Sequence, residues 1–166
     1  MNKSSTVTAR KTQMTVGPVP NSTGLVVHGE MLTVETSERV ELVDLTARVM
    51  DMVHRAGVRE GIVSLWSMHT TCALLVNEVQ TALHADIKTA LERIVARDGD
   101  WMHNDPARSD CDRMNADSHL RAMLLGHSLT LQIAGGELVL GQWQRILMGE
   151  LDGPRARNIR AQAWGI

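Results

Sequence analysis

The sequence predicts a single α+β domain made of largely antiparallel β-sheets with two or three helices. Short apolar runs of strand length, bounded by turn residues, recur along most of the chain. A few longer segments instead repeat their apolar residues at the 3.6-residue period of an amphipathic helix. Most of the strands are joined by short turns, and this combination is typical of α+β folds.

Composition limits the class of protein further. The chain has 166 residues, enough for one domain with its own core, and ten Met and four Trp must fill the interior because Phe and Tyr are absent. A net charge of −2 gives no electrostatic reason to expect nucleic acid or an anionic membrane as partner. No apolar run approaches the ~20 residues that span a bilayer. Cys72 and Cys111 form no disulfide or CxxC pattern, so we expect a cytoplasmic protein with reduced thiols.

The first residues differ in composition from the rest. Met1–Gly29 contains no acidic residue and is rich in Ser and Thr, which weakly resembles an organellar transit segment. Arg is scarce there, so we favour a flexible tail over residues 1–24 and a folded domain over residues 25–166.

The first elements are two strands and a helix. Leu25–Glu35 and Arg39–Val43 have strand character and are separated by a short polar turn. Thr46 is the expected N-cap of a helix whose apolar residues recur at helical spacing and which ends at Gly57.

The next two strands carry the most informative polar residues. The apolar runs Ile62–Trp66 and Cys72–Val76 lie on either side of the polar run His69–Thr71, and the second run ends on Asn77 and Glu78. Polar groups removed from water cost free energy unless they find partners. We therefore predict that these strand ends deliver an imidazole, two hydroxyls, an amide and a carboxylate to one pocket.

The middle of the chain contains two helices and a long loop. Thr81–Ala96 fits the 3.6-residue period well and is predicted as an amphipathic helix. Residues 101–114 lack any period and are rich in Asp and Arg, and long loops of this kind are often functional. Asn115 is the expected N-cap of a short helix, Ala116–Leu125, which Gly126 ends.

The last third of the chain is predicted as strands. Ser128–Gly141 has the pattern of a hairpin whose turn is Gly135-Gly136, since two glycines supply the positive φ that a two-residue turn requires. Gln142–Leu151 is a further strand, Asp152–Pro154 a turn, and Ala156–Trp164 the final strand.

Three histidines are candidates for a shared site. His69, His103 and His119 lie at element ends or in the long loop, and Cys111 lies midway between the last two. Helical spacing puts His119 on the same face of its helix as Ala116 and Met123. Neutral imidazoles bind zinc and similar metals, but the spacing fits no standard zinc motif. Two interpretations stay open: a metal site, or histidines that are buried with partners or exposed to solvent.

The other candidates also have structural explanations. Asn115 caps a helix in the simplest interpretation, Glu78 and Asn77 end a strand, and Asp86 flanks the apolar stripe of its helix. Arg155 and Arg157, which follow the Gly-Pro turn, either bind phosphate or are surface charges. A period of two also places Gln142, Gln144 and Glu150 on one strand face, which suits a pocket wall or a subunit contact equally. Walker A, GxGxxG, GxSxG and HExxH motifs are absent.

Several motifs in fixed order resemble those of the YjbQ family, whose members are also described as secondary thiamine-phosphate synthases. They are HTTCALLVNE, His103, the Asn-Ala-x-x-His helix with its Leu-Leu-Gly hairpin entry, Gly-x-Trp-Gln and Asp-Gly-Pro-Arg. The resemblance covers the chain from about Leu25 to its end. It implies a small α+β domain that assembles as a homotrimer around a polar, histidine-lined cavity, with a divalent metal ion that is zinc-like or magnesium.

The implied reaction joins a pyrimidine pyrophosphate to a thiazole phosphate with loss of pyrophosphate. Dedicated enzymes for it use a (β/α)8 barrel of at least ~200 residues, so we expect a secondary activity and a different physiological substrate. The alternative is a non-catalytic trimeric binding module for a phosphorylated or anionic small ligand.

The resemblance also assigns expected roles to individual residues. The expected metal ligands are His69, His103 and His119. The expected catalytic residues are His69, Glu78, Asp86 and His119, of which Asp86 lies in a segment that departs from the family pattern. The expected substrate-binding residues are Thr70, Thr71, Asn77, Asn115, Trp143, Gln144, Glu150 and Arg155.

Overall fold

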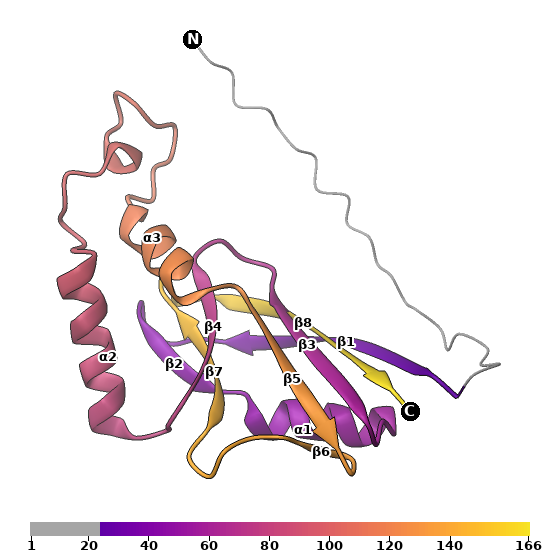
Figure 1. Cartoon of the computed structure of the whole chain (residues 1–166). Helices are drawn as coiled ribbons and strands as arrows, with labels where there is room; N and C mark the ends of the chain where they lie inside the picture. The colour runs from indigo at the N-terminus through magenta and orange to yellow at the C-terminus, as the bar shows by residue number, and fades with distance from the viewer. Residues whose placement is uncertain (1–23) are drawn as a thin grey trace.

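A computed structural model describes residues 24–166 and shows an α+β domain with three α-helices in that range (Figure 1). The predicted tail over residues 1–24 lies, apart from Gly24, outside the described residues. The elements in chain order are β1 Val26–Glu35, β2 Glu41–Asp44, α1 Thr46–Ala56, β3 Gly61–Ser67, β4 Cys72–Asn77, α2 Thr81–Ile94, a 3-10 turn Met102–Asn104, α3 Ala116–Leu125, β5 Ser128–Ala134, β6 Glu137–Leu138, β7 Arg145–Glu150 and β8 Ala156–Gly165.

The strands form two antiparallel sheets, which confirms the predicted fold class. The larger sheet has the order β1-β8-β3-β5-β6, and the smaller has the order β2-β7-β4. Strands that follow one another in the chain therefore often belong to different sheets. Among the described helices, none is long and apolar enough to cross a membrane.

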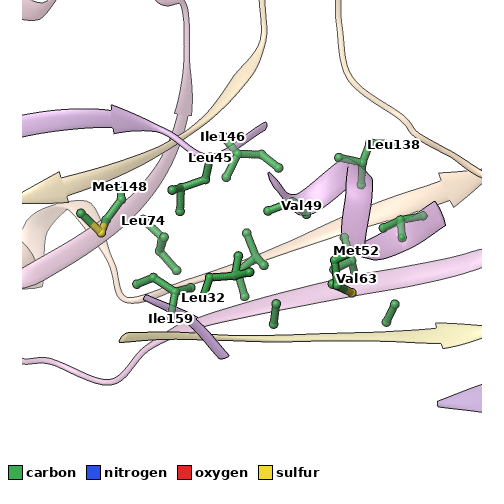
Figure 2. Close-up of a cluster of buried hydrophobic side chains, with 14 of the residues drawn as sticks. Leu32, Leu45, Val49, Met52, Val63, Leu74, Leu138, Ile146, Met148 and Ile159 are labelled. Atoms are coloured by element: carbon green, nitrogen blue, oxygen red, sulfur yellow. The ribbon is translucent and has the colours of Figure 1, made fainter. Parts of the chain in front are cut away.

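The main core lies between the sheets and the apolar face of α1. Figure 2 shows Leu45, Val49 and Met52 of the α1 region packed toward side chains of both sheets, among them Val63 of β3 and Ile146 of β7. All five are essentially excluded from solvent. Flexible methionine takes the place of aromatic rings here, as the composition predicted.

The helix α1 begins differently from the prediction. Its N-cap is Leu45, so the prediction of Thr46 as N-cap is wrong. The Thr46 hydroxyl instead donates to Asp44 Oδ1 at 2.6 Å and accepts from the backbone N–H of Ile146 at 2.9 Å, which ties the helix start to β7. The predicted end is confirmed, because Gly57 adopts a left-handed φ of 68° after the last turn.

A second, smaller core joins α2 to α3 and to the end of β7. It contains Leu91 of α2, Ala122 of α3 and Leu151. Buried Arg121 donates from Nε to the carbonyl of Val95 at 3.1 Å, which satisfies an orphan carbonyl at the C-terminal end of α2. The helix ends at Ile94, two residues before the predicted end.

The start of α3 departs from the expected cap geometry. Asn115 occupies the N-cap position as predicted, but its side chain makes no capping hydrogen bond. Asn104 Oδ1 accepts from the N–H of Ala116 at 3.0 Å instead. The loop before α3 therefore supplies its cap, and the Asn115 side chain is free for other contacts.

The final strands agree with the predicted hairpin but not with the predicted start of β7. Gly135 and Gly136 have φ of 60° and 88°, as a two-residue hairpin turn requires. Strand β7 begins only at Arg145, so Gln142 and Gln144 precede the strand instead of lying on its face.

Three connections cross between the two sheets near one another. The segments β1–β2, β3–β4 and β7–β8 each leave one sheet and enter the other. They are joined directly: Gly153 N–H donates to Arg39 O at 3.0 Å, and Leu151 N–H donates to Thr71 O at 3.3 Å. Backbone groups at such crossings leave the regular ladders, so this end of the domain is rich in polar side chains that bond to them.

Candidate functional site

A hollow of about 370 Å³ lies at this meeting point of the crossings. We call it the arginine pocket. The β3–β4 turn supplies one wall, the long loop and the start of α3 a second, and the β7–β8 turn a third. Its lining residues are Met68, His69, Thr70, Thr71, His103, Cys111, Arg113, Asn115, His119, Asp152, Arg155 and Arg157.

Asp152 is the polar centre of the pocket wall. Its carboxylate is buried and accepts from the guanidinium groups of Arg39 at 3.1 Å, Arg113 at 3.2 Å and Arg155 at 3.1 Å. Asn115 Nδ2 donates to the same carboxylate at 2.8 Å, so this amide serves the pocket and not the helix cap. One carboxylate thus holds three cations. Arg39 also donates to Asp117, whereas Arg113 and Arg155 line the pocket and keep further N–H donors for another anion.

A buried ion pair lies behind the pocket wall. Glu150 and Arg157 are almost fully excluded from solvent, and Arg157 Nε donates to Glu150 Oε2 at 2.6 Å. Arg157 Nη2 also donates to the hydroxyl of Thr71 at 3.0 Å. The Glu150 carboxylate accepts from Thr36 Oγ1 at 3.1 Å and from the N–H of Asp152 at 2.8 Å. This network fixes the position of both turns that line the pocket.

The protonation of His69 follows from its contacts. Its Nε2 accepts from the backbone N–H of Asn158 at 2.8 Å, and an amide can only donate, so Nε2 carries a lone pair. Burial, together with the positive charge of Arg157, lowers the pKa of His69 below its ordinary value. The ring is therefore neutral near pH 7, with its proton on Nδ1, and presents an N–H donor.

His103 and His119 form a second feature of the pocket. Their ring centroids are 5.1 Å apart and their planes meet at 89°, an edge-to-face contact. Burial and the neighbouring His103 ring lower the pKa of His119 below its ordinary value. His119 is thus a neutral imidazole near pH 7, which can accept a proton.

The three histidines as arranged do not fit the predicted three-ligand metal site. The Nε2 lone pair of His69 is used by a backbone amide, and its Nδ1 carries a proton, so the neutral ring offers no lone pair to a cation. In the described part of the chain, no three His, Cys, Asp or Glu side chains converge to hold a metal ion.

The structure brings together many of the predicted site residues. His69, Thr70, Thr71, His103, Asn115, His119 and Arg155 line the arginine pocket, and Glu150 supports it from behind. The predicted helix face of His119 holds only in part, because Ala116 is buried whereas Met123 is exposed.

Five predicted site residues lie elsewhere in the single chain: Asn77, Glu78, Asp86, Trp143 and Gln144. Within one copy of the chain the two ends of β4 do not share a pocket, because the strand is six residues long and spans roughly 17 Å at ~3.3 Å per residue. Asn77 ends the strand, and its side chain accepts from the N–H of Glu78 at 2.9 Å. Asp86 is exposed on α2, Trp143 is exposed before β7, and Gln144 accepts from the N–H of Gly141.

The sequence prediction missed Asp152 and Arg113 as pocket residues, and it named Arg157 only as either a phosphate ligand or a surface charge. One signal for Arg157 was available, since β8 buries every second residue and Arg157 falls on the buried face with Ile159 and Ala161. A charge on a buried strand face requires a partner. Nothing in the local pattern around Asp152 or Arg113 distinguishes them from ordinary turn and loop charges.

The pocket chemistry favours an anionic ligand. Three guanidinium groups line the hollow together with the carboxylate of Asp152, although the charge of Arg157 is balanced by Glu150 behind the wall. The histidines and threonines add neutral donors. Guanidinium groups match phosphate and carboxylate oxygens with paired hydrogen bonds. The neutral imidazole of His119 beside these donors adds a group that can take up a proton.

Comparison with other proteins places the chain among known relatives. The family model described as "UPF0047 protein YjbQ-like" matches residues 30–166. A UPF0047 protein of Methanothermobacter thermautotrophicus is 42% identical over 139 residues, covering 84% of this chain and 93% of that protein. One of Archaeoglobus fulgidus is 41% identical over 132 residues, covering 80% and 98%.

Solved structures agree with these relatives. The crystal structure of a YbjQ-like protein of unknown function from Sulfolobus solfataricus has a TM-score of 0.80 and 34% identity, covering 86% of this chain and 99% of that one. A hypothetical protein from Aeropyrum pernix has a TM-score of 0.77 and 33% identity, covering 84% and 99%. The chain therefore belongs to the YjbQ (UPF0047) family.

Proposed function

We propose that the chain binds a phosphorylated small molecule in the arginine pocket. The observation that carries this proposal is the grouping of Arg113, Arg155 and Arg157 with a neutral His69 around one hollow. The phosphate accepts hydrogen bonds from the free guanidinium N–H groups and from Nδ1–H of His69. Within residues 24–166 that Nδ1 makes no hydrogen bond to protein, so the donor is available to a ligand.

Arg155 provides the sharpest test of phosphate binding. Arg155→Met removes one guanidinium donor, and we expect the affinity for pyrophosphate to fall about 10-fold or more, because a charge-assisted hydrogen bond is lost. Arg48→Met is the matched control, since Arg48 is exposed on α1 and does not line the pocket. Isothermal titration of both variants with phosphate and pyrophosphate measures the effect. Equal affinities in both variants, or no binding by the unmodified protein, would contradict the proposal.

Within this proposal, His119 accepts a proton from the bound ligand. Its neutral ring lies beside the donors that hold the phosphate, so a ligand group that loses a proton during reaction has an acceptor nearby. His119→Ala should abolish turnover while phosphate binding and folding persist. The non-catalytic alternative instead predicts saturable binding without turnover in any phosphate-release assay.

The reaction to assay first is the one that the family resemblance implies, the joining of a pyrimidine pyrophosphate to a thiazole phosphate. The pocket supports it by offering donors for a leaving diphosphate. Complementation of a strain deficient in thiamine-phosphate synthase by the unmodified gene, but not by His69→Ala, is the expected result. No rescue at high expression would remove this reaction from the proposal.

Two further expectations from the resemblance are tested on the purified protein. Sedimentation velocity measures whether the chain assembles as a homotrimer. Metal analysis measures whether a divalent ion is present. The candidate ligands for such an ion are His103 and His119, whose rings are in edge-to-face contact. The phosphate proposal depends on neither result.

A further inference from the structure

A second hollow lies against the first and shares two of its residues. It is lined by Trp101, Met102, His103, Ala116, His119 and Leu120 and has a volume of about 370 Å³. We call it the apolar pocket. His103 and His119 also line the arginine pocket, so the two imidazoles form the boundary between both hollows. Apart from these two rings, the lining of the apolar pocket is entirely hydrophobic.

The long loop holds Trp101 in a defined position. Its indole Nε1 donates to the carbonyl of Ala96 at 2.9 Å, and its backbone N–H donates to the carbonyl of Gly99 at 2.9 Å. The ring lies so close to Gly99 that a Cβ there would come within 2.6 Å of the indole. Trp101 is therefore packed against the first residues of the loop between α2 and α3, although most other side chains of this loop face solvent.

The same loop is fixed on the other side of His103. Asn104 Oδ1 accepts from the N–H of Ala116 and so attaches the 3-10 turn to the start of α3. His103 lies between two anchored residues, Trp101 and Asn104, and its ring meets that of His119 edge to face. A half-buried indole, methionine and leucine side chains and two imidazole edges make a site for a flat apolar group.

We infer that the apolar pocket binds the organic part of the phosphorylated ligand, so that the preferred ligands are phosphate esters with an aromatic or other flat apolar group. This inference rests on the proposed phosphate site, because the two hollows meet at the His103–His119 pair. The phosphate lies among the arginines, and the ring lies on Trp101. Phosphate esters of polar polyols have no apolar surface to bury in this pocket, so the pocket does not increase their affinity.

The test compares three simple probes: inorganic phosphate, glycerol phosphate and phenyl phosphate. Burying an aromatic ring contributes about 1.5–3 kcal/mol, which corresponds to an affinity gain of roughly 10- to 100-fold. We expect phenyl phosphate to bind at least about 10-fold more tightly than the other two. Trp101→Ala should remove this gain and leave the affinity for inorganic phosphate unchanged, whereas Arg155→Met weakens all three.

Two further variants separate binding from folding. Trp101→Phe keeps a flat ring without the Nε1 hydrogen bond and should retain most of the preference for phenyl phosphate. Trp66→Ala is the matched control, because Trp66 is 54% exposed on β3 and lines neither pocket. Circular dichroism of each variant establishes that the fold is kept before affinities are compared.

The outcomes distinguish the two proposals. The apolar pocket has no part in ligand binding if phenyl phosphate binds no more tightly than inorganic phosphate. The same conclusion follows if Trp101→Ala still binds phenyl phosphate more tightly than inorganic phosphate. If no probe binds at all, the proposed function fails first. If Trp101→Ala changes the sedimentation coefficient of the ligand-free protein, the pocket is a contact between copies of the chain, and the inference is overturned.

Discussion

Replacing Glu150 by glutamine should destabilise this protein more than any surface substitution of the same kind. The carboxylate is fully buried and pairs with Arg157, which is 1% exposed, and it accepts further bonds from Thr36 and Asp152. Glu150→Gln keeps the size and shape of the side chain but removes its charge. The guanidinium of Arg157 then stays buried without a counter-charge.

The magnitude follows from the burial of the pair. Removing one partner of a buried ion pair costs about 3–5 kcal/mol, a large share of the roughly 5–15 kcal/mol that stabilises a domain. The matched control is Glu38→Gln, because Glu38 pairs with Lys88 at 2.8 Å with its side chain 62% exposed. Exposed pairs of this kind contribute at most about 1 kcal/mol.

Urea denaturation followed by circular dichroism measures both variants. We expect the double variant Glu150→Gln/Arg157→Met to lose less stability than Glu150→Gln alone, since no unpaired charge is left. Inorganic phosphate should recover part of the loss in Glu150→Gln, because Arg157 lines the arginine pocket. A loss in Glu150→Gln no larger than that in Glu38→Gln would refute the reasoning.

The remaining predictions concern pH and close packing. Folding lowers the pKa of His69 and of His119, so their contribution to stability is complete above pH ~6.5 and declines as the pH falls below that value. The melting temperature should therefore fall between pH 7 and pH 5.5, with a weaker dependence in His69→Asn/His119→Asn; equal slopes would contradict this origin. Gly153→Ala should cost about 1–3 kcal/mol by overpacking, because its Cβ would lie 2.5 Å from the carbonyl oxygen of Glu38. Gly149→Ala is the control for thermal denaturation, since its Cβ would meet only ordinary contacts near 3.7 Å.

Local patterns were sufficient to predict most of the elements. The period of two identified β8 and the glycine pair identified the β5–β6 turn, because both signals arise from neighbouring residues. The start of β7 was placed too early, since Gln142–Gln144 continue the alternation of the strand without pairing to β4 or β2. Pairing with a distant partner decides where such a strand begins.

The candidate site was predictable only in part, for a related reason. His69, His103 and His119 were recognised as unusual residues, and the fold brings them to one pocket. Asn77 and Glu78 have an equally polar pattern, but they lie at the far end of β4. Asp152 also binds Arg39 and Arg113, which come from distant segments, so a local window contains only its contact with Arg155.

The position of the pocket at three crossings links ligand binding to the whole domain. A phosphate held between the β3–β4 and β7–β8 turns would contact two segments that each connect one sheet to the other. A ligand at 100 times its dissociation constant adds about 2.7 kcal/mol to the free energy of unfolding. Amide hydrogen exchange should then slow in strands of both sheets together, including residues that never touch the ligand.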